Sequence, residues 1–123
     1  MFTNIIYPDT LDLRWLHDDE WELLKDFRCI FSDNGNKTTI LVPAGFNNDL
    51  ASVPRIFQNI VPVVGPQNLP SLIHDWCYEN RWRTRKDSDD LFMAGLEALK
   101  VSWVRRCLMY SAVRIGGKGE WED

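Results

Sequence analysis

The sequence lacks a surplus of positive charge. Its 123 residues include 14 Lys and Arg against 18 Asp and Glu, which gives a formal net charge of −4 and an isoelectric point near 5.1. A nucleic-acid-binding domain needs basic residues to neutralise phosphates. The run "RWRTRK" at 81–86 is basic, but the acidic "DSDD" follows at once, which favours a solvated helix end. We therefore expect no nucleic-acid partner.

Paired cysteines and long apolar runs are also missing. The three cysteines, Cys29, Cys77 and Cys107, form no CxxC pair, and their odd number favours free thiols in a reducing compartment. The N-terminus has no basic stretch before an apolar one, so we expect no signal peptide. The longest uncharged run, 56–73, contains three prolines and several amides, which are unsuited to a transmembrane segment. We expect a soluble chain.

What is present is the composition of one compact domain. Hydrophobic residues make up 45% of the chain and charged residues 26%, and the length suits a single core. We expect one domain over 1–123, mainly β in 1–45 and mainly α in 52–117, with a loose tail at 118–123.

The first third of the chain has the alternating pattern of β-strands. In "EWELLKDFRCIF" the apolar residues of one parity, interrupted by Lys25, are Trp21, Leu23, Phe27, Cys29 and Phe31. Asn34 and Gly35 then form a turn signal, and "TTILVPAGF" predicts a returning strand. "IIYP" and "LDLRWL" are weaker strand signals. These segments predict a small antiparallel sheet or hairpin.

The rest of the chain predicts helices. Ser52, followed by a proline two residues on, indicates a short helix that ends near Ile60. Pro70 opens a second helix that runs to about Trp82. "DSDD" begins a third, with a bend expected near "KVSW" and an end at the Gly pair that starts with Gly116. The predicted fold class is therefore α+β, with the sheet followed by a short helix and two longer packed helices.

Seven polar residues lie among apolar neighbours: Asp49, Ser52, Arg55, His74, Asp75, Tyr78 and Asp90. His74 and Tyr78 are one helical turn apart on one face, with Asp75 at its edge. Antiparallel packing of the two long helices would bring Asp90 to this face. A histidine with a carboxylate on one ring nitrogen can take a proton from water with the other. We predict His74, Asp90 and Tyr78 as catalytic residues.

The remaining members of the set are candidate ligands and supporting groups. Asp75 or Asp49 could hold a divalent cation together with loop carbonyls, and a cation there would stabilise the charge that develops when water attacks a carbonyl or phosphoryl group. Ser52 and Arg55 would support the site. A purely structural interpretation stays open, in which His74 is a core histidine, Asp49 forms an Asx-turn and Arg55 an ordinary ion pair.

Three segments together resemble a family of small phage and prophage proteins known as domain of unknown function 1353. They are "VPAGFNNDLASVPRIF", "LIHDWCYEN" and "DSDDLF", and the resemblance covers about 20–100. It implies a phage or prophage origin, with a location in the host cytoplasm or the virion, and brings no settled activity.

"HDWCY" is also similar to the His-Asp-x-Cys-Tyr helix of secreted phospholipases A2, and "VGPQN…HDWCY…SDDLF" resembles viral capsid members of that group. The resemblance implies that His74 activates water, Asp75 binds calcium, and Asp90 orients the histidine with support from Tyr78. The chain departs from the group in its missing disulfide framework and in its calcium loop, where Gly65 is the single glycine instead of two.

Two functions follow as hypotheses. The first is a metal-assisted hydrolase, with calcium or zinc, acting on an ester or amide of the host envelope, either lipid or peptidoglycan. The alternative is a non-catalytic virion component or host-factor-binding protein in which the polar cluster is a structural core. Trp15 and Trp121 would then be available for an interface. Partners would be a host protein, a virion protein or an envelope component.

Overall fold

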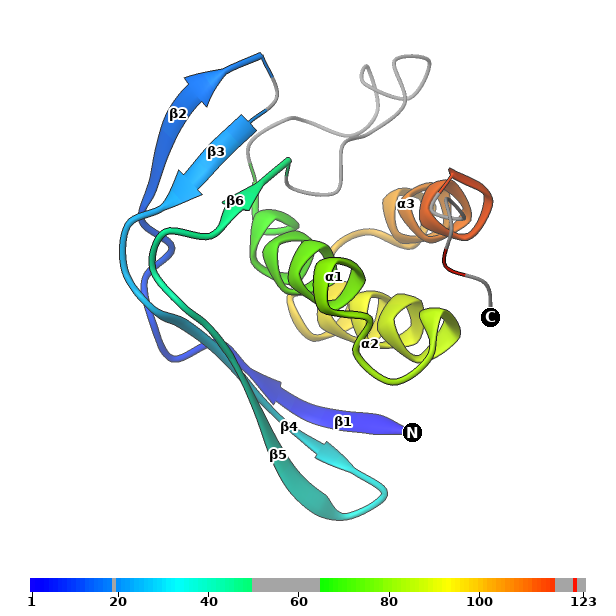
Figure 1. Cartoon of the computed structure of the whole chain (residues 1–123). Coiled ribbons are helices and arrows are strands. Elements are labelled where there is room, and N and C mark those ends of the chain that lie inside the picture. The colour runs from blue at the N-terminus through cyan, green and yellow to red at the C-terminus, as the bar shows by residue number, and fades with distance from the viewer. Residues whose placement is uncertain (19, 50–64, 117–120, 122–123) are drawn as a thin grey trace.

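The computed structural model describes residues 1–18, 20–49, 65–116 and 121. Its strands are β1 (Phe2–Ile6), β2 (Leu13–His17), β3 (Glu20–Leu23), β4 (Phe27–Asp33), β5 (Asn36–Val42) and β6 (Asn47–Asn48). Its helices are α1 (Asn68–Asn80), α2 (Arg85–Ala98) and α3 (Trp103–Gly116). Strands therefore come first and helices second, and the predicted α+β class is confirmed (Figure 1).

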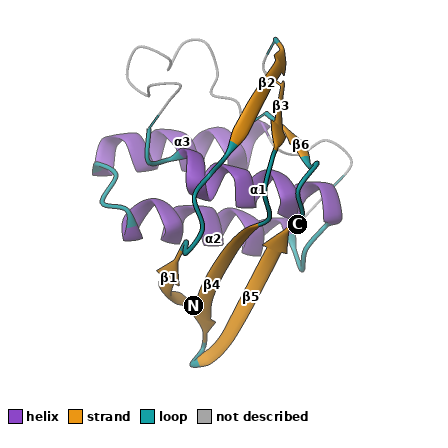
Figure 2. Ribbon diagram, turned by 90° about the vertical axis from the view of Figure 1, so that its left-hand side faces the viewer, coloured by secondary structure: helices purple, strands orange, loops and turns teal. Residues whose placement is uncertain are grey.

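The strands form two antiparallel three-stranded sheets, ordered β1-β4-β5 and β2-β3-β6. Both sheets lie on the same side of the helices, and the strands run in front of the helices in Figure 2. α2 packs against β1, whereas α1 contacts β5 and β6. α3 packs against α2 on the side away from the sheets (Figure 1).

The β4–β5 hairpin forms where the turn signal predicts it. Asp33 pairs with Asn36, so the turn consists of Asn34 and Gly35, with φ angles of 50° and 88°. Two successive positive φ angles are the requirement of a type I′ turn, which Asn-Gly meets at little cost. The two-residue turn fixes the register of the hairpin and thereby directs alternate side chains of both strands into the core.

The alternating apolar residues of the first third point into one core even though they belong to two sheets. Leu23 on β3 is buried, and so are Phe27, Cys29 and Phe31 on β4. The interrupting Lys25 lies between the two strands, where it is exposed and pairs with Asp12. The break in the hydrophobic pattern therefore marks the passage of the chain from one sheet to the other.

Close packing brings the chain just after β1 against the helices. A Cβ atom on Gly95 of α2 would lie 2.3 Å from the Tyr7 hydroxyl and 2.9 Å from the Pro70 Cβ. Real Cβ atoms do not approach other atoms so closely, so only glycine lets the chain after β1 and the start of α1 meet α2 here.

The first long helix has nearly the predicted position. α1 begins two residues before Pro70 and ends at Asn80, and Arg81 follows in the left-handed conformation with a φ of 50°. α2 begins earlier than "DSDD", because the Thr84 side chain accepts a hydrogen bond from the Asp87 backbone N–H and caps the helix.

The long helix predicted from "DSDD" to Gly116 is two helices. α2 ends at Ala98, and Lys100 has a φ of 58°, which no α-helix tolerates. The Ser102 Oγ accepts a hydrogen bond from the Arg105 N–H, as an N-cap does, at the start of α3. The bend expected near "KVSW" is therefore a full break, and it leaves α3 free to pack at its own angle on α2.

The predicted short helix from Ser52 to Ile60 lies outside the described residues, and so does the predicted tail apart from Trp121. Within the described part of the chain, no helix combines the length and the apolar character needed to cross a bilayer.

Candidate functional site

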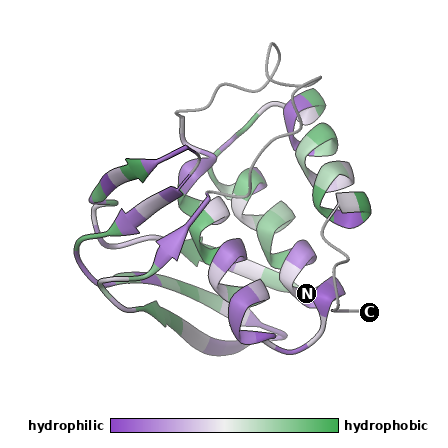
Figure 3. Ribbon diagram, turned by 45° about the horizontal axis from the view of Figure 1, so that its top comes forward, coloured by the Kyte–Doolittle hydropathy of each residue, from purple (hydrophilic) through white to green (hydrophobic). Residues whose placement is uncertain are grey.

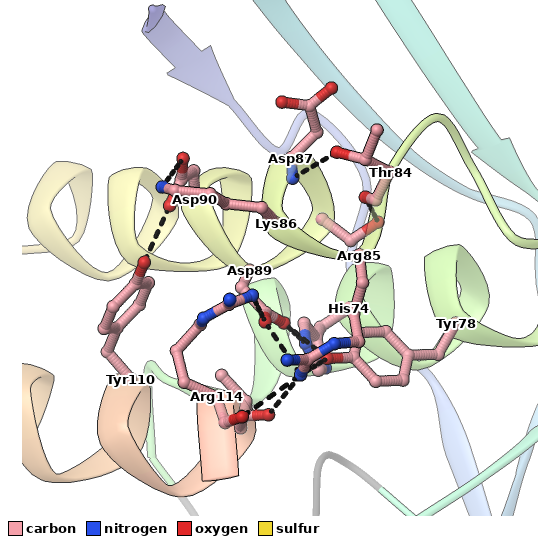
Figure 4. A network of polar contacts seen from close by, with 12 residues as sticks. His74, Tyr78, Thr84, Arg85, Lys86, Asp87, Asp89, Asp90, Tyr110 and Arg114 are labelled. Carbon is pink, nitrogen blue, oxygen red and sulfur yellow. Dashed lines mark hydrogen bonds and ion pairs between the residues drawn. The ribbon is translucent and has the colours of Figure 1, made fainter. Parts of the chain in front are cut away.

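His74 and Asp89 form a buried pair where α1 and α2 meet. The His74 Nε2 and the Asp89 Oδ1 are 2.7 Å apart (Figure 4). The side chains are 5% and 0% exposed. α1 and α2 run antiparallel across a short connection, which brings a residue near the middle of α1 opposite the first turns of α2.

Three further side chains surround the Asp89 carboxylate. The Tyr78 hydroxyl donates to Oδ1 over 2.7 Å and the Arg114 guanidinium donates to Oδ2 over 2.8 Å. Arg85 adds an ion pair at 3.5 Å. Burial by itself would raise the pKa of Asp89, but the hydrogen bonds from His74, Tyr78 and Arg114 outweigh it and hold that pKa below its usual value. Asp89 is therefore a carboxylate at neutral pH.

Arg85 connects this carboxylate to the end of α3. Its side chain is 4% exposed, and its Nη1 donates to the Tyr78 hydroxyl and to the backbone carbonyls of Val113 and Arg114, over 3.2–3.3 Å. The last carbonyls of a helix have no partner within that helix, so a buried guanidinium satisfies them well. The expectation that the whole run 81–86 is solvated is wrong for Arg85.

The prediction that Asp90 lies beside His74 is wrong, because the neighbouring residue Asp89 takes that place. Asp90 instead accepts hydrogen bonds from Lys86 on its own helix, over 2.9 Å, and from the Tyr110 hydroxyl of α3, over 2.8 Å. Its carboxylate ties α2 to α3 near the surface.

Helical geometry explains the difference between the two aspartates. Asp89 lies three and seven residues before Phe92 and Leu96, which are both buried, so all three residues share the inward face of α2. One residue further along, Asp90 is rotated by about 100°. The spacing of Asp89 to Phe92 and Leu96 was a signal in the sequence that would have favoured Asp89 over Asp90 as the inward residue.

Tyr78 joins His74 on the predicted face of α1 but supports Asp89 and not Asp90. The two ring centroids are 4.3 Å apart. Burial and the adjacent Asp89 carboxylate raise the pKa of Tyr78, so its hydroxyl stays protonated and donates. Trp121 packs edge-on against the Tyr78 ring at 5.0 Å. Trp121 is therefore engaged with the site, whereas Trp15 is largely exposed.

The orientation of His74 leaves one ring nitrogen for chemistry. Because Asp89 is ionised, it accepts the Nε2 proton, and the neutral ring then carries its lone pair on Nδ1. Among the described residues, no hydrogen bond uses Nδ1. Phe92 packs near the ring, with centroids 4.9 Å apart. The arrangement can hold the ring in one orientation and take up a proton at Nδ1.

The two candidate metal ligands lie next to each other. The Asp49 backbone N–H donates to the Asp75 Oδ2 over 3.1 Å, so the chain after β6 meets α1 beside His74. Among the described residues, no group of three or more His, Cys, Asp or Glu side chains could hold a metal ion. Calcium takes six to eight oxygen ligands, and the described carboxylates would provide only part of that shell. Ser52 and Arg55 lie outside the described residues.

The cysteine inside "HDWCY" is not a nucleophile. Cys77 is fully buried, and burial raises its pKa well above the ordinary range of a thiol. Burial likewise raises the pKa of Cys29 to about 12. All three cysteines are free thiols, as the sequence predicts, and Cys107 is half-buried. The chemistry of this region therefore rests on His74 and its carboxylate.

Three residues of the cluster were missing from the predicted set: Arg85, Asp89 and Arg114. Arg85 stands four residues before Asp89 on the same face of α2, and Arg114 stands four after Tyr110 on α3. Both arginines therefore follow the inward stripe of their helices. A charged residue at an inward position indicates a buried polar network, because burying a charge without a partner is costly.

Fold and site together define a small α+β domain whose antiparallel helices enclose a histidine–carboxylate pair. The chain belongs to the family described as "Protein of unknown function (DUF1353)", which matches residues 21–113. It is 37% identical over 99 residues to "Uncharacterized protein y4jT" of Sinorhizobium fredii (strain NBRC 101917 / NGR234). The match covers 79% of this chain but 29% of that protein, so the chain spans less than a third of its relative's length. No solved structure matches it significantly.

Proposed function

We propose that the chain is a hydrolase of phage or prophage origin that acts on an ester or amide of the host envelope, with His74 as its general base. The observation that carries the proposal is the 2.7 Å contact between the His74 Nε2 and the Asp89 carboxylate. A carboxylate on one nitrogen fixes the tautomer of the imidazole and stabilises the imidazolium that forms when the other nitrogen takes a proton.

In the proposed reaction, His74 removes a proton from water through Nδ1 while the water oxygen attacks the substrate carbonyl. Asp89 keeps its charge throughout and stabilises the protonated ring. Tyr78 and Arg114 hold the carboxylate in place through hydrogen bonds of 2.7 and 2.8 Å. The attack gives a tetrahedral intermediate. When this intermediate collapses, the proton passes from His74 to the leaving group.

The similarity of "HDWCY" to secreted phospholipases A2 supports the same assignment of roles once Asp89 replaces Asp90. In that group a later aspartate orients the histidine, with tyrosine support. Here the Asp89 carboxylate contacts the His74 Nε2 and accepts a hydrogen bond from the Tyr78 hydroxyl. His74 and Tyr78 are one turn apart on α1. This agreement in roles favours a lipid ester over an amide as the substrate.

A divalent cation remains part of the proposal as an auxiliary group, with calcium or zinc as the candidates. Asp75 and Asp49 are the residues that would hold it, and it would stabilise negative charge on the substrate oxygen. Because the described carboxylates make up only part of a coordination shell, no step above depends on the cation.

The test compares His74→Gln with the wild type on phospholipid vesicles and on purified peptidoglycan, with chelator and then with calcium or zinc. The glutamine amide can donate to Asp89 as Nε2 does but cannot act as a base. We expect the wild type to hydrolyse one substrate class and the variant to lose roughly 100-fold or more in kcat. Equal activity in a folded variant, or no hydrolysis of either substrate by the wild type, would overturn the proposal.

One observation favours the second candidate, a non-catalytic virion component or host-factor-binding protein with a structural polar core. Arg85 satisfies two backbone carbonyls of α3 as well as Asp89, so the cluster joins three helices. On this hypothesis His74→Gln leaves binding to a virion or host partner unchanged, and His74→Ala lowers the free energy of unfolding by about 1–3 kcal/mol because it removes a partner of a buried carboxylate.

A further inference from the structure

The outward face of α3 is apolar. Val104 and Ile115 are 53% and 76% exposed, and they lie eleven residues apart, which is about three helical turns. The half-buried Leu108 lies between them, four residues after Val104, on the same face. Trp103, at the first position of α3, is 67% exposed. Hydrophobic positions recur along this helix, at the right of the view in Figure 3.

α3 is attached to the protein through its opposite face. Met109 is its one buried residue, and Tyr110 and Arg114 donate to carboxylates of α2. In a helix, positions 109 and 113 point about 120–180° away from positions 104 and 115. The apolar stripe formed by Val104, Leu108 and Ile115 therefore points away from α2, with Val104 and Ile115 exposed and Leu108 half-buried.

The charge of this part of the chain is opposite to that of the rest. Residues 100–116 contain four of the fourteen basic residues and none of the eighteen acidic ones. Lys100 and Arg105 are exposed. In a chain with a net charge of −4, this concentrates accessible positive charge beside the apolar stripe.

We propose that α3 is a docking surface for anionic lipid, lying in the plane of the membrane interface with Val104, Leu108 and Ile115 inserted. Helices with basic residues flanking an apolar face, and with tryptophan near it, bind the interface of anionic membranes in this way. A second copy of the chain fits less well, because a symmetric contact through α3 would bring like charges together. Nucleic acid fits less well too, because its charged backbone would not bury an exposed aliphatic stripe.

Docking through α3 would place the His74–Asp89 pair close to the lipid. Arg114 and the last carbonyls of α3 contact the site from the inward side of the helix, while the apolar stripe lies on the outward side. The docking does not depend on hydrolysis, since it uses none of the proposed catalytic groups. If both the docking and the proposed hydrolysis hold, lipid is the substrate class.

The experiment is vesicle flotation of the full chain with phosphatidylcholine alone and with equal parts of phosphatidylcholine and phosphatidylglycerol, at low and high salt. We expect flotation with the anionic vesicles, weakened by salt, and little with the neutral ones. No flotation with either, or equal flotation with both, would overturn the proposal.

The double variant Val104→Glu with Ile115→Glu tests the location of the surface. Both residues are exposed, so the fold should persist, and we expect affinity for anionic vesicles to fall roughly tenfold or more. The matched control is Leu24→Glu with Leu41→Glu, which adds the same charge at residues of 50% and 48% exposure outside the helices. An equal loss in both double variants would overturn the assignment to α3. A wild-type dimer that α3 substitution dissociates would assign the stripe to a second copy instead.

Discussion

α1 and α3 both pack against α2, but different forces hold them there. α1 contributes Leu72, Ile73 and Cys77 to a core that continues into the sheets. α3 buries Met109 in a smaller cluster with Phe92 of α2. Because stabilisation by apolar burial grows with the area removed from water, α1 belongs to the stable centre of the fold and α3 to its margin.

Polar contacts compensate at the α3 margin. Tyr110 binds Asp90, Arg114 binds Asp89, and Arg85 binds the last carbonyls of α3. Such contacts are directional, so they fix the position of α3 more than they stabilise it. Asp89 of α2 therefore has two roles: it orients His74 of α1, and it holds α3 through Arg114. Substitutions that separate these two roles of Asp89 test both the fold and the proposed chemistry.

The largest effect is expected from Asp89→Asn. This change removes the negative charge that two arginines and His74 surround, while Arg85 stays buried. Loss of one partner from a buried ion pair is strongly destabilising, so we expect the free energy of unfolding to fall by about 3 kcal/mol. Urea denaturation at neutral pH measures it.

Asp90→Asn is the matched control, with the same change one residue away. The Asp90 side chain is 39% exposed and its ion pair with Lys86 is at the surface, so we expect a loss below about 1 kcal/mol. If the two variants lost the same stability, the distinction between a buried and a superficial carboxylate would be wrong.

A smaller effect is expected from Arg114→Met, which removes the bond from α3 to Asp89 but keeps the apolar stem. Hydrogen exchange should show that the α3 amides open about 1.5 kcal/mol more easily, while the α1 amides keep their protection. Arg105→Met is the control, because Arg105 is exposed on the same helix. Equal loss of protection in α1 and α3 would mean that the two helices open as one unit.

The parts of the fold that depend on local sequence were predictable. Asn34-Gly35 determines a turn by its own conformational preferences, and the alternation from Leu23 to Phe31 determines which side chains face the core. The break between α2 and α3 was not predictable in full, because "KVSW" contains no glycine or proline and depends on the left-handed Lys100. Local preferences alone do not indicate such a residue.

The site was predicted in part for a related reason. His74 and Tyr78 are one turn apart, so their common face follows from helical geometry alone. The spacing of Asp89 to the apolar Phe92 and Leu96 favours it over Asp90 as an inward residue, but its contact with His74 depends on how α2 is rotated against α1, which is a tertiary property. The inward positions of Arg85 and Arg114 depend in the same way on the packing of α2 and α3, and the acidic run after 81–86 made Arg85 look like a solvated charge.

The smallest expected effect is on the pH dependence of stability in acid. It isolates Asp89, the carboxylate that contacts both His74 of α1 and Arg114 of α3. Contacts with His74, Tyr78 and Arg114 outweigh burial and lower the pKa of folded Asp89, so its contribution to stability is complete above the unfolded pKa near 4. As the pH falls below that value, the unfolded chain binds a proton that the folded chain does not, and the contribution is lost as the pH passes the folded pKa. One such group adds at most about 1.4 kcal/mol per pH unit to the acid slope.

We expect urea denaturation across this range to give a shallower slope in Asp89→Asn than in the wild type. Asp9, whose pKa is lowered chiefly by its hydrogen bond with Arg28, is unchanged in both proteins and cancels in the difference. Parallel slopes would mean that folding does not lower the pKa of Asp89, and that the hydrogen bonds around it do no more than offset its burial.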